Sequence, residues 1–571
     1  MKLLKYILLV SIPIIFAETV TGQTVLEKVF VHTDRNIYVA GEDILYSFFL
    51  QENNNETTGS IVGYMELINN NNKPVAQLRF KITDSYSHGL MSVPDSLTTG
   101  IYKLRAYTRY MRNFGYESFY TQNLLIYNPF KTNIKTEPLD SLTPVSDKTA
   151  DQIFPANNIS KISTPVVNYS PRQMVTLKYR VDTSSFVHGD KCKLSFAVAV
   201  STDNIACRVL EDKMNMEISE MSVETGHKFF YAEDKGPYLE GSVISRQDLG
   251  AVAKETLYLS VPGKNTFLQY AVTDGNGGFR FMLPDFQGNT EYIIQPSDFN
   301  DDILVKTGSP YANMLDYSFN DQGIWDDELM DFASRLGVNY QVNKIYDIKG
   351  RIIEKVDSSG FVTYRFYGIP DVHVDLDDYV DLPTMEEVFH ELVPGVALRK
   401  QGDKAVFTFV SEPGKPKPSG PDVVFLDGVI LDDPAFVADI DPELIRSIDV
   451  IQGEYQVGRL TFNGLVSISS YKGDMCGIDY PNAGLRTSSK ILEREKVYQN
   501  ITDPDSIHIK PNLPDFRNTL YWNPDVKPDS EGFIEITFYT SDFLSEYRIS
   551  IEGITDKGMP VSYEEQISVS K

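Results

Sequence analysis

Two short runs of aspartates are the side chains of this sequence best suited to binding a metal ion. Asp298, Asp301 and Asp302 form the first run, and Asp375, Asp377 and Asp378 form the second. A calcium site in a protein takes about six to eight oxygen ligands from a shaped loop. Neither run has the spaced Asp/Asn–Gly pattern of such a loop, so both are interpreted as solvated turns. We therefore expect no metal and no cofactor.

The other reactive residues match no common catalytic pattern. None of the 7 histidines stands in a His-Glu-x-x-His arrangement, and the sequence has no Gly-x-Ser-x-Gly elbow, phosphate loop or zinc-spaced cysteine pair. His390 and Glu391 fall on an expected helix, where a solvated position is favoured over a ligand, and His32 is expected to be structural. The sequence predicts a protein that is not an enzyme, without catalytic, cofactor-binding or metal residues, and its binding residues are unknown at this stage.

Cysteine usage leaves one pairing open. The 3 cysteines are too few for a disulfide-based scaffold. Cys192 and Cys207 are close enough in sequence to form a disulfide in an oxidising compartment. Cys192 also falls on the apolar side of an expected strand, where a buried thiol is common. Both alternatives stay open.

The N-terminus indicates an exported protein, and the net charge limits its partners. Lys2 and Lys5 precede the apolar run Ile7–Phe16, which is too short to span a bilayer, so residues 1–22 are predicted to be a signal peptide. No later run is long and apolar enough to cross a membrane. The formal net charge of −26 argues against nucleic acid and anionic lipid as partners. We expect a periplasmic or outer-membrane-associated location.

Alternation of apolar and polar residues dominates the chain and predicts half-buried β-strands. It is clearest at Ile101–Tyr110 and Lys191–Val200. The turn signal Asp274–Gly278 is expected to close a tight hairpin that directs Phe279 and Phe281 into a core. Short strands at regular intervals indicate tandem sandwiches. The predicted fold is mostly β and multidomain, with macroglobulin- or immunoglobulin-like β-sandwiches and one α/β domain.

Two segments resemble the macroglobulin-type β-sandwich of the α2-macroglobulin superfamily. They are His32–Leu50 and Val93–Gly115, and the C-terminal residues 511–571 resemble a late sandwich domain of the same superfamily. Protease trapping in that superfamily needs a thioester formed from a Cys-Gly-Glu-Gln run. Here Cys476-Gly477 is followed by Ile478-Asp479, so this thioester cannot form and protease trapping is disfavoured.

Val423–Ser470 resembles the plug domain of TonB-dependent outer-membrane receptors. The resemblance rests on Val424–Val429, on Asp441–Gly453 and on Asn463–Ile468, in this order and at the usual spacing. A helix is expected before them at Leu382–Leu392, with Thr384 as its cap. The resemblance covers the plug alone, without the β-barrel or a convincing TonB box, and it implies an origin in Bacteroidota.

These patterns divide the chain into units. Residues 237–297 resemble the transthyretin-like regulatory domain found beside carboxypeptidases, and Trp325–Leu336 has helical spacing. The expected order is 1–22 signal peptide, 23–130 macroglobulin-type sandwich, 131–165 linker, 166–235 second sandwich, 236–297 transthyretin-like domain, 298–365 irregular or helical connection, 366–475 plug-like domain, 476–510 linker and 511–571 C-terminal macroglobulin-type sandwich.

The resemblances imply a binding role in the envelope. The expected function is a non-enzymatic scaffold, accessory to an outer-membrane β-barrel protein such as a TonB-dependent receptor. The alternative is a ligand-capture protein that holds a glycan or peptide for uptake. The sequence contains only 2 tryptophans, Trp325 and Trp522, which weakens the glycan alternative because sugar-binding platforms often use tryptophan.

Overall fold

A computed structural model describes much of the chain, and in this part the fold is mostly β and multidomain, as predicted. The predicted signal peptide lies outside the described residues. Within them, no helix is both long enough and apolar enough to cross a membrane. The described residues are 27–52, 59–132, 159–162, 167–181, 192–201, 229–263, 267–313, 317, 325–346, 351–354, 365–401, 404–409, 423–431, 433, 435–477, 484–501, 513–555 and 560–571.

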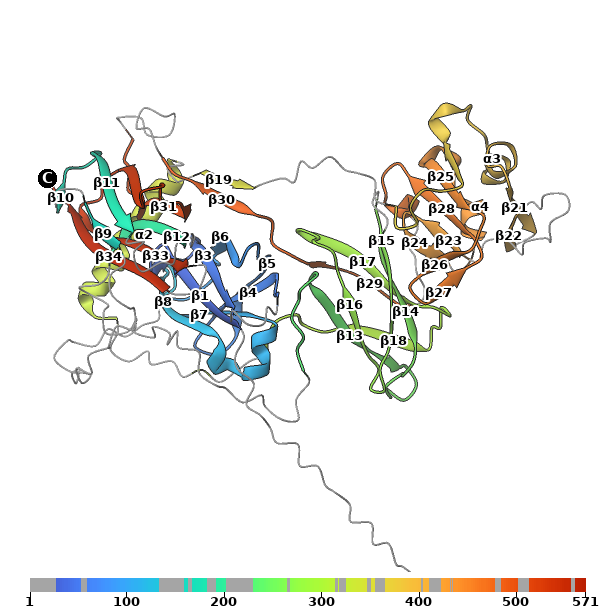
Figure 1. Cartoon of the computed structure of the whole chain (residues 1–571), viewed down its shortest axis with the longest axis horizontal. Coiled ribbons are helices and arrows are strands. Elements are labelled where there is room, and N and C mark those ends of the chain that lie inside the picture. Colours follow the sequence, from blue (N-terminus) through green and yellow to red (C-terminus); the bar gives the residue numbers. More distant parts are fainter. Residues whose placement is uncertain are drawn as a thin grey trace, which may run out of the picture.

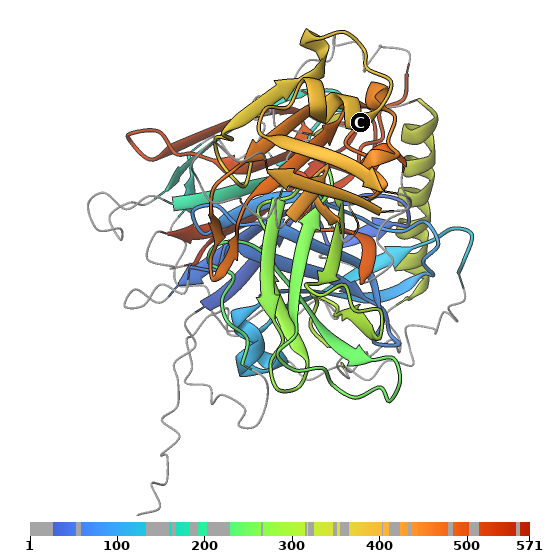
Figure 2. The same ribbon diagram turned by 90° about the vertical axis from the view of Figure 1, so that its right-hand side faces the viewer.

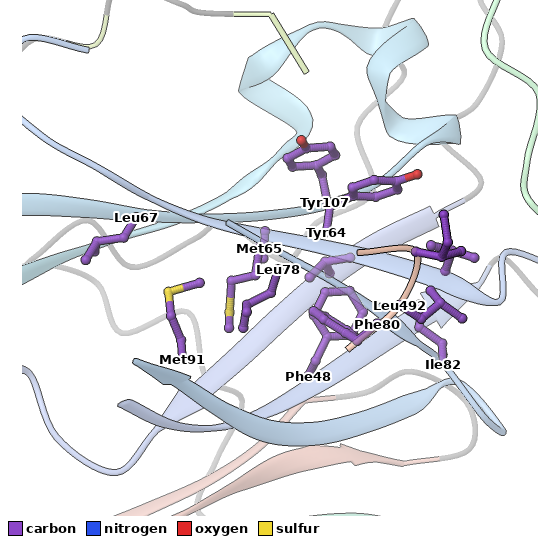
Figure 3. Packing of buried hydrophobic residues seen from close by; sticks show 14 of the residues in the cluster. Phe48, Tyr64, Met65, Leu67, Leu78, Phe80, Ile82, Met91, Tyr107 and Leu492 are labelled. Atoms are coloured by element: carbon purple, nitrogen blue, oxygen red, sulfur yellow. The ribbon is translucent and has the colours of Figure 1, made fainter. Parts of the chain in front are cut away.

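An N-terminal sandwich forms the first unit. Its strands are β1 (Glu27–Thr33), β2 (Ile37–Val39), β3 (Asp43–Glu52), β4 (Val62–Ile68), β5 (Pro74–Lys81), β6 (Tyr86–Ser92), β7 (Gly100–Thr108) and β8 (Tyr120–Tyr127). One sheet has the order β1-β3-β6, and the other has the order β2-β8-β7-β4-β5. Figure 3 shows Phe48, Met65, Phe80 and Met91 packed together in the core of this unit, with Leu492 from a distant segment beside them.

The C-terminal sandwich is assembled from two distant parts of the chain. Its strands are β9 (Ile159–Lys161), β10 (Asn168–Tyr169), β11 (Met174–Val181), β12 (Cys192–Val200), β31 (Thr519–Val526), β32 (Phe533–Tyr539), β33 (Ser545–Thr555) and β34 (Pro560–Val569). The sheet orders are β10-β34-β33-β12-β31 and β32-β11-β9. The sequence analysis places 166–235 and 511–571 in separate sandwiches, whereas here they share both sheets. Each part alone has too few strands to bury its apolar face.

A middle sandwich corresponds to the transthyretin-like prediction. It contains β13 (Tyr238–Ser245), β14 (Thr256–Val261), β15 (Phe267–Val272), β16 (Gly278–Met282), β17 (Asn289–Pro296), β18 (Ile303–Thr307) and β29 (Leu485–Lys490). The sheet orders are β16-β13-β18 and β15-β14-β17-β29. Asp274–Gly278 forms the expected turn and Phe279 and Phe281 are buried, but β15 and β16 belong to different sheets, so the expected hairpin is wrong. Strand β29 comes from the predicted 476–510 linker.

The α/β unit is the last part of the architecture. Its sheet has the order β20-β25-β28-β23-β24, from β20 (Val372–Asp375), β23 (Val423–Leu426), β24 (Val429–Leu431), β25 (Ile445–Ile451) and β28 (Leu465–Ser470). One face packs against α3 (Met385–Glu391), α4 (Ala435–Ala438) and the hairpin of β21 (Val396–Gln401) and β22 (Lys404–Phe409). On the other face, Phe425 and Leu465 share a core with Tyr258 and Leu268 of the middle sandwich.

Two further elements connect the units. Helix α2 (Asp327–Ile345) covers the predicted helix at Trp325–Leu336, and its buried Leu329 and Phe332 share one core with the N-terminal and C-terminal sandwiches. Strand β19 (Arg351–Glu354) pairs with β30 (Lys496–Gln499), again within the predicted linker. Figure 1 shows the C-terminal sandwich at one end and the α/β unit at the other, and Figure 2 looks onto the α/β end.

Candidate binding surface on the α/β unit

The candidate site lies next to a two-residue turn between β23 and β24. Asp427 and Gly428 link β23 to β24, and both have positive φ angles, 48° and 85°. Such paired left-handed residues form the turn that matches the twist of a tight hairpin, and Asp-Gly is a preferred sequence for it. The local sequence therefore determines this turn, as the Asp-Gly signal indicates.

The Asp427 side chain fastens this turn to the end of β28. Its carboxylate accepts hydrogen bonds from the Ser470 amide at 2.7 Å, the Ser470 hydroxyl at 2.6 Å and the Met475 amide at 2.8 Å. Burial raises the pKa of Asp427, while these three hydrogen bonds act in the opposite direction. The contacts fix the backbone on both sides of Tyr471, which directly follows β28.

Four large apolar residues, one of them Tyr471, are exposed at the end of the sheet where β20 and β28 finish. The exposed fractions are 49% for Tyr379, 80% for Val380, 42% for Leu444 and 41% for Tyr471. Val380 and Tyr379 follow the 3₁₀ turn η5 (Leu376–Asp378), and Leu444 ends the turn η6 (Pro442–Leu444). We call these four residues the η5 surface.

Direct contacts hold the parts of the η5 surface together. The Tyr471 hydroxyl donates to Asp377 Oδ1, and this hydrogen bond raises the pKa of the tyrosine. The Tyr471 amide donates to the Leu444 carbonyl at 3.1 Å. Tyr471 therefore links η5 to η6, so the segments that carry the four apolar residues meet at the same end of the sheet.

The second aspartate run lies at the rim of the η5 surface. Asp375 caps η5 by accepting from the Asp377 amide at 3.2 Å, and Asp377 and Asp378 are exposed. In the first run, Asp298 accepts from the Asn300 amide at 3.1 Å. No group of three or more metal-ligating side chains occurs among the described residues. Local turn hydrogen bonds account for the carboxylates of Asp298 and Asp375.

A buried aspartate, Asp449, holds several polar side chains on the central part of the same sheet. Asp449 on β25 accepts from the Tyr367 hydroxyl at 2.7 Å, pairs with Arg365 Nε at 2.7 Å and lies 2.6 Å from His373 Nδ1. Across the strands, Asp449 sits directly between His373 and Ser467. A catalytic triad needs the imidazole between the carboxylate and the hydroxyl. This cluster has the carboxylate in the middle, so it secures the 365–371 segment and does not activate Ser467.

The remaining predicted residues are dispersed. His32 is buried in the N-terminal sandwich, and its two ring nitrogens lie 2.6 Å from Ser195 Oγ and 2.8 Å from Ser550 Oγ of the C-terminal sandwich, which is a structural position. His390 is exposed beside Glu391 at 2.9 Å. Both tryptophans are buried, so neither can stack on a sugar.

Two of the three cysteines lie among the described residues, Cys192 and Cys476. Cys192 begins β12 and packs beside a core, while Cys207 lies outside the described residues, so their pairing stays a prediction. Burial raises the pKa of Cys476 to about 12, helped by Asp427 and Asp474. A thiol of this pKa stays protonated at neutral pH and is a poor nucleophile.

Sequence reasoning missed the residues that organise this unit. Asp427 and Asp449 both look like solvated acids in the sequence, but they are buried and carry several hydrogen bonds. A signal for Asp449 is its place in the apolar run Ile448–Ile451. An acid within such a run needs partners, because a buried carboxylate without them is costly.

Comparisons with known proteins give no family assignment. No protein-family model matches the chain, and no match was found among curated proteins. Among solved structures, methylamine-reacted Salmonella alpha-2-macroglobulin is 9% identical, with 97% of this chain and 40% of that chain covered and a TM-score of 0.24. Trypsin-activated Escherichia coli alpha-2-macroglobulin is 10% identical, with coverages of 96% and 42% and a TM-score of 0.24.

A third solved structure is an adhesin. Escherichia coli FdeC is 9% identical, with 48% of this chain and 60% of that chain covered and a TM-score of 0.14. The chain spans about 40% of the length of the alpha-2-macroglobulins with which it aligns.

Proposed function

We propose that this chain is a non-enzymatic binding protein of the bacterial envelope, which docks onto an outer-membrane β-barrel protein through its η5 surface. The observation that carries the proposal is the gathering of four exposed apolar side chains, two of them tyrosines, at one end of the α/β sheet. Single exposed apolar residues are common, but contiguous apolar patches mark interaction sites. Tyrosine is also enriched at interfaces.

The carboxylates around the η5 surface favour a partner with positive charge. The exposed carboxylates Asp377, Asp378, Asp441 and Glu443 lie on η5 and η6, and they outnumber the two exposed cations nearby, Arg446 and Lys472. A partner with basic side chains around an apolar contact would complement this surface and be steered toward it. The plug resemblance of residues 366–475 favours a TonB-dependent receptor of Bacteroidota as the barrel.

The test is site-specific photo-crosslinking with the full chain in native envelopes. A photoreactive residue at Val380 should crosslink to one barrel protein, whereas the same residue at Leu249, which is 69% exposed in the middle sandwich, should not. Val380→Asp and Leu444→Asp should abolish co-purification of that barrel, and Leu249→Asp should leave it unchanged.

Point variants are preferable to deletion of residues 366–475. Removing the α/β unit would expose Tyr258 and Leu268, which share a core with Phe425, so a loss of binding would have two explanations. Equal crosslinking from Val380 and Leu249, or barrel recovery that survives both aspartate variants, would refute the η5 surface as the docking site.

A further inference from the structure

Arginine and aromatic side chains alternate along the junction between the N-terminal and middle sandwiches. Arg112 lies over the Phe230 ring with its guanidinium carbon 4.0 Å from the centroid, and Arg109 lies 5.3 Å from the same ring. Arg109 and Arg280 lie 5.4 and 5.1 Å from the Tyr238 ring, and Arg280 lies 5.0 Å from Tyr231. We call these six residues the arginine–aromatic ladder.

The backbone that carries the ladder is fixed by specific contacts. Asn113, in the 3₁₀ turn η1 (Tyr110–Phe114), donates to the Phe230 carbonyl and accepts from the Phe230 amide, both at 2.7 Å. The Tyr64 hydroxyl donates to Glu233 at 2.7 Å, and Glu233 also accepts from the Tyr238 amide at 2.6 Å. The segment from Phe230 to Tyr238 is therefore held against both sandwiches before any ligand arrives.

Several carboxylates lie near the ladder arginines: Glu240 pairs with two of them, and Glu233 and Asp234 lie in the segment between Phe230 and Tyr238. Arg109 and Arg280 share one carboxylate, Glu240, at 2.7 and 2.8 Å. Arg112 forms no ion pair with a described residue. Its Nη1 donates to the Pro310 carbonyl at 3.3 Å, and burial lowers its pKa.

The buried guanidinium of Arg109 also has an incomplete set of hydrogen bonds. Arg109 is 2% exposed, and its Nε has no hydrogen-bond partner among the described residues. Guanidinium groups are normally paired when they are buried, because an unpaired buried charge is costly. Among the ladder arginines, Arg112 is the one without an ion pair to a described residue, although the chain has a net charge of −26.

Flat apolar rings are exposed beside these cations. Tyr231 is 55% exposed and Phe229 is 40% exposed, and their ring centroids are 5.0 Å apart. Arg280 keeps 30% of its side chain exposed and Arg112 is half-buried. The exposed part of the ladder and the adjoining Phe229 thus combine planar guanidinium groups, which match carboxylate and sulfate geometry, with aromatic faces that pack on ring-shaped ligands.

We propose that three partly exposed ladder residues, Arg112, Arg280 and Tyr231, together with the adjoining Phe229, bind an anionic glycan through its carboxylate or sulfate groups and sugar rings. The inference does not depend on the barrel partner proposed above. A peptide fits less well, because β13, the ladder strand that carries Tyr238, is paired on both sides and cannot accept an added strand.

The test is calorimetric titration of the full mature chain with hexasaccharides. Oligogalacturonate supplies carboxylates, a heparin hexasaccharide supplies sulfates, and a neutral cello-oligosaccharide of the same length is the reference. At least one anionic hexasaccharide should bind, and the neutral one should bind at least about tenfold more weakly, because a lost charge-assisted hydrogen bond has that effect. The anionic hexasaccharide that binds more tightly shows whether the site prefers carboxylate or sulfate groups.

Variants locate the binding site. Arg112→Gln and Tyr231→Ala should each weaken binding by about tenfold, because each loses a group that contacts the ligand. Arg335→Gln is the matched control, since Arg335 is 51% exposed on α2 and far from the ladder in sequence. Tyr231 is exposed, so its variant tests the site even where Arg112→Gln disturbs folding, which near-ultraviolet circular dichroism would show.

Three results would overturn the inference. They are no binding of either anionic hexasaccharide, neutral binding as tight as anionic binding, and equal effects of Arg335→Gln and the ladder variants. Inorganic sulfate is the last probe. If inorganic sulfate displaces the hexasaccharide when both supply the same concentration of negative charge, the site binds any small anion. The sugar rings then do not contribute to binding, and the glycan proposal is wrong.

Discussion

Glu27 should make the folded protein less stable as the pH rises. It begins β1, it is fully buried, and it lies directly opposite Glu52 on β3. Burial, and then the charge of Glu52, raise the pKa of Glu27 to about 7, against hydrogen bonds from Thr108 and Ser60 that lower it. Like charges directly opposite each other on neighbouring strands destabilise a sheet.

The sign and size of the effect follow from proton linkage. The ordinary glutamate pKa is 4.5, so the folded state holds the Glu27 proton more tightly than the unfolded state does. The stability from this proton is fully present below pH 4.5 and is lost as the pH rises through 7. A shift of this size corresponds to about 3 kcal/mol in the free energy of unfolding.

Replacing Glu27 with glutamine should remove this dependence. Urea unfolding can be followed by tryptophan fluorescence, since Trp522 lies 5.3 Å from the His32 ring at the junction of the N-terminal and C-terminal sandwiches. From about pH 5 to about pH 8, the free energy of unfolding of the wild type should fall about 2.5 kcal/mol more than that of Glu27→Gln. At the upper limit the variant should be the more stable protein.

The comparison of variants isolates Glu27 from other titrating groups. Burial also raises the pKa of Glu233 and Asp427, so the wild-type slope alone is not diagnostic. Glu454→Gln, at an exposed position, should keep the wild-type slope. Parallel pH curves for wild type and Glu27→Gln would refute the reasoning, because they would mean that Glu27 is ionised in the folded state throughout.

Three further substitutions test the packing. Asp427→Ala should destabilise the α/β unit by about 3–5 kcal/mol, because two backbone amides and a hydroxyl lose a charged acceptor, and hydrogen exchange of those amides should accelerate. Gly241→Ala should cost about 1–3 kcal/mol in calorimetric unfolding, because a Cβ there would overlap the Lys306 carbonyl. Trp522→Ala should cost about 3–5 kcal/mol, measured by circular dichroism in urea, because it leaves a cavity at the junction.

Local structure was predictable from the sequence because it depends on near neighbours. The alternation at Lys191–Val200 corresponds to β12, and that at Ile101–Tyr110 corresponds to β7, but both strands are buried on both faces, so the prediction that they are half-buried is wrong. The helix expected at Leu382–Leu392 is α3, and Thr384 caps it by accepting from the Glu387 amide at 3.2 Å. Strand alternation, helix caps and turns depend on residues only a few positions apart, so a single sequence is enough to predict them.

The partners of the strands could not be predicted in the same way. Alternation shows which face of a strand is buried, but not which strand covers it. Val175 on β11 pairs with Phe538 on β32, and Leu194 on β12 pairs with Gly553 on β33. Both pairs join residues more than three hundred positions apart, so the division of this sandwich between two segments was not visible in the sequence.

Net charge misleads for a related reason. A formal charge of −26 argues against nucleic acid and anionic membranes because such partners cover large areas of the surface. Charges are screened over about 8–10 Å at physiological ionic strength, so a small ligand responds mainly to the groups around its own site. At the arginine–aromatic ladder those groups include Arg112, which forms no ion pair with a described residue, and Arg280, which shares Glu240 with Arg109. The acidity of the whole chain therefore does not exclude a short anionic ligand, and it would keep longer polyanions away from the rest of the surface.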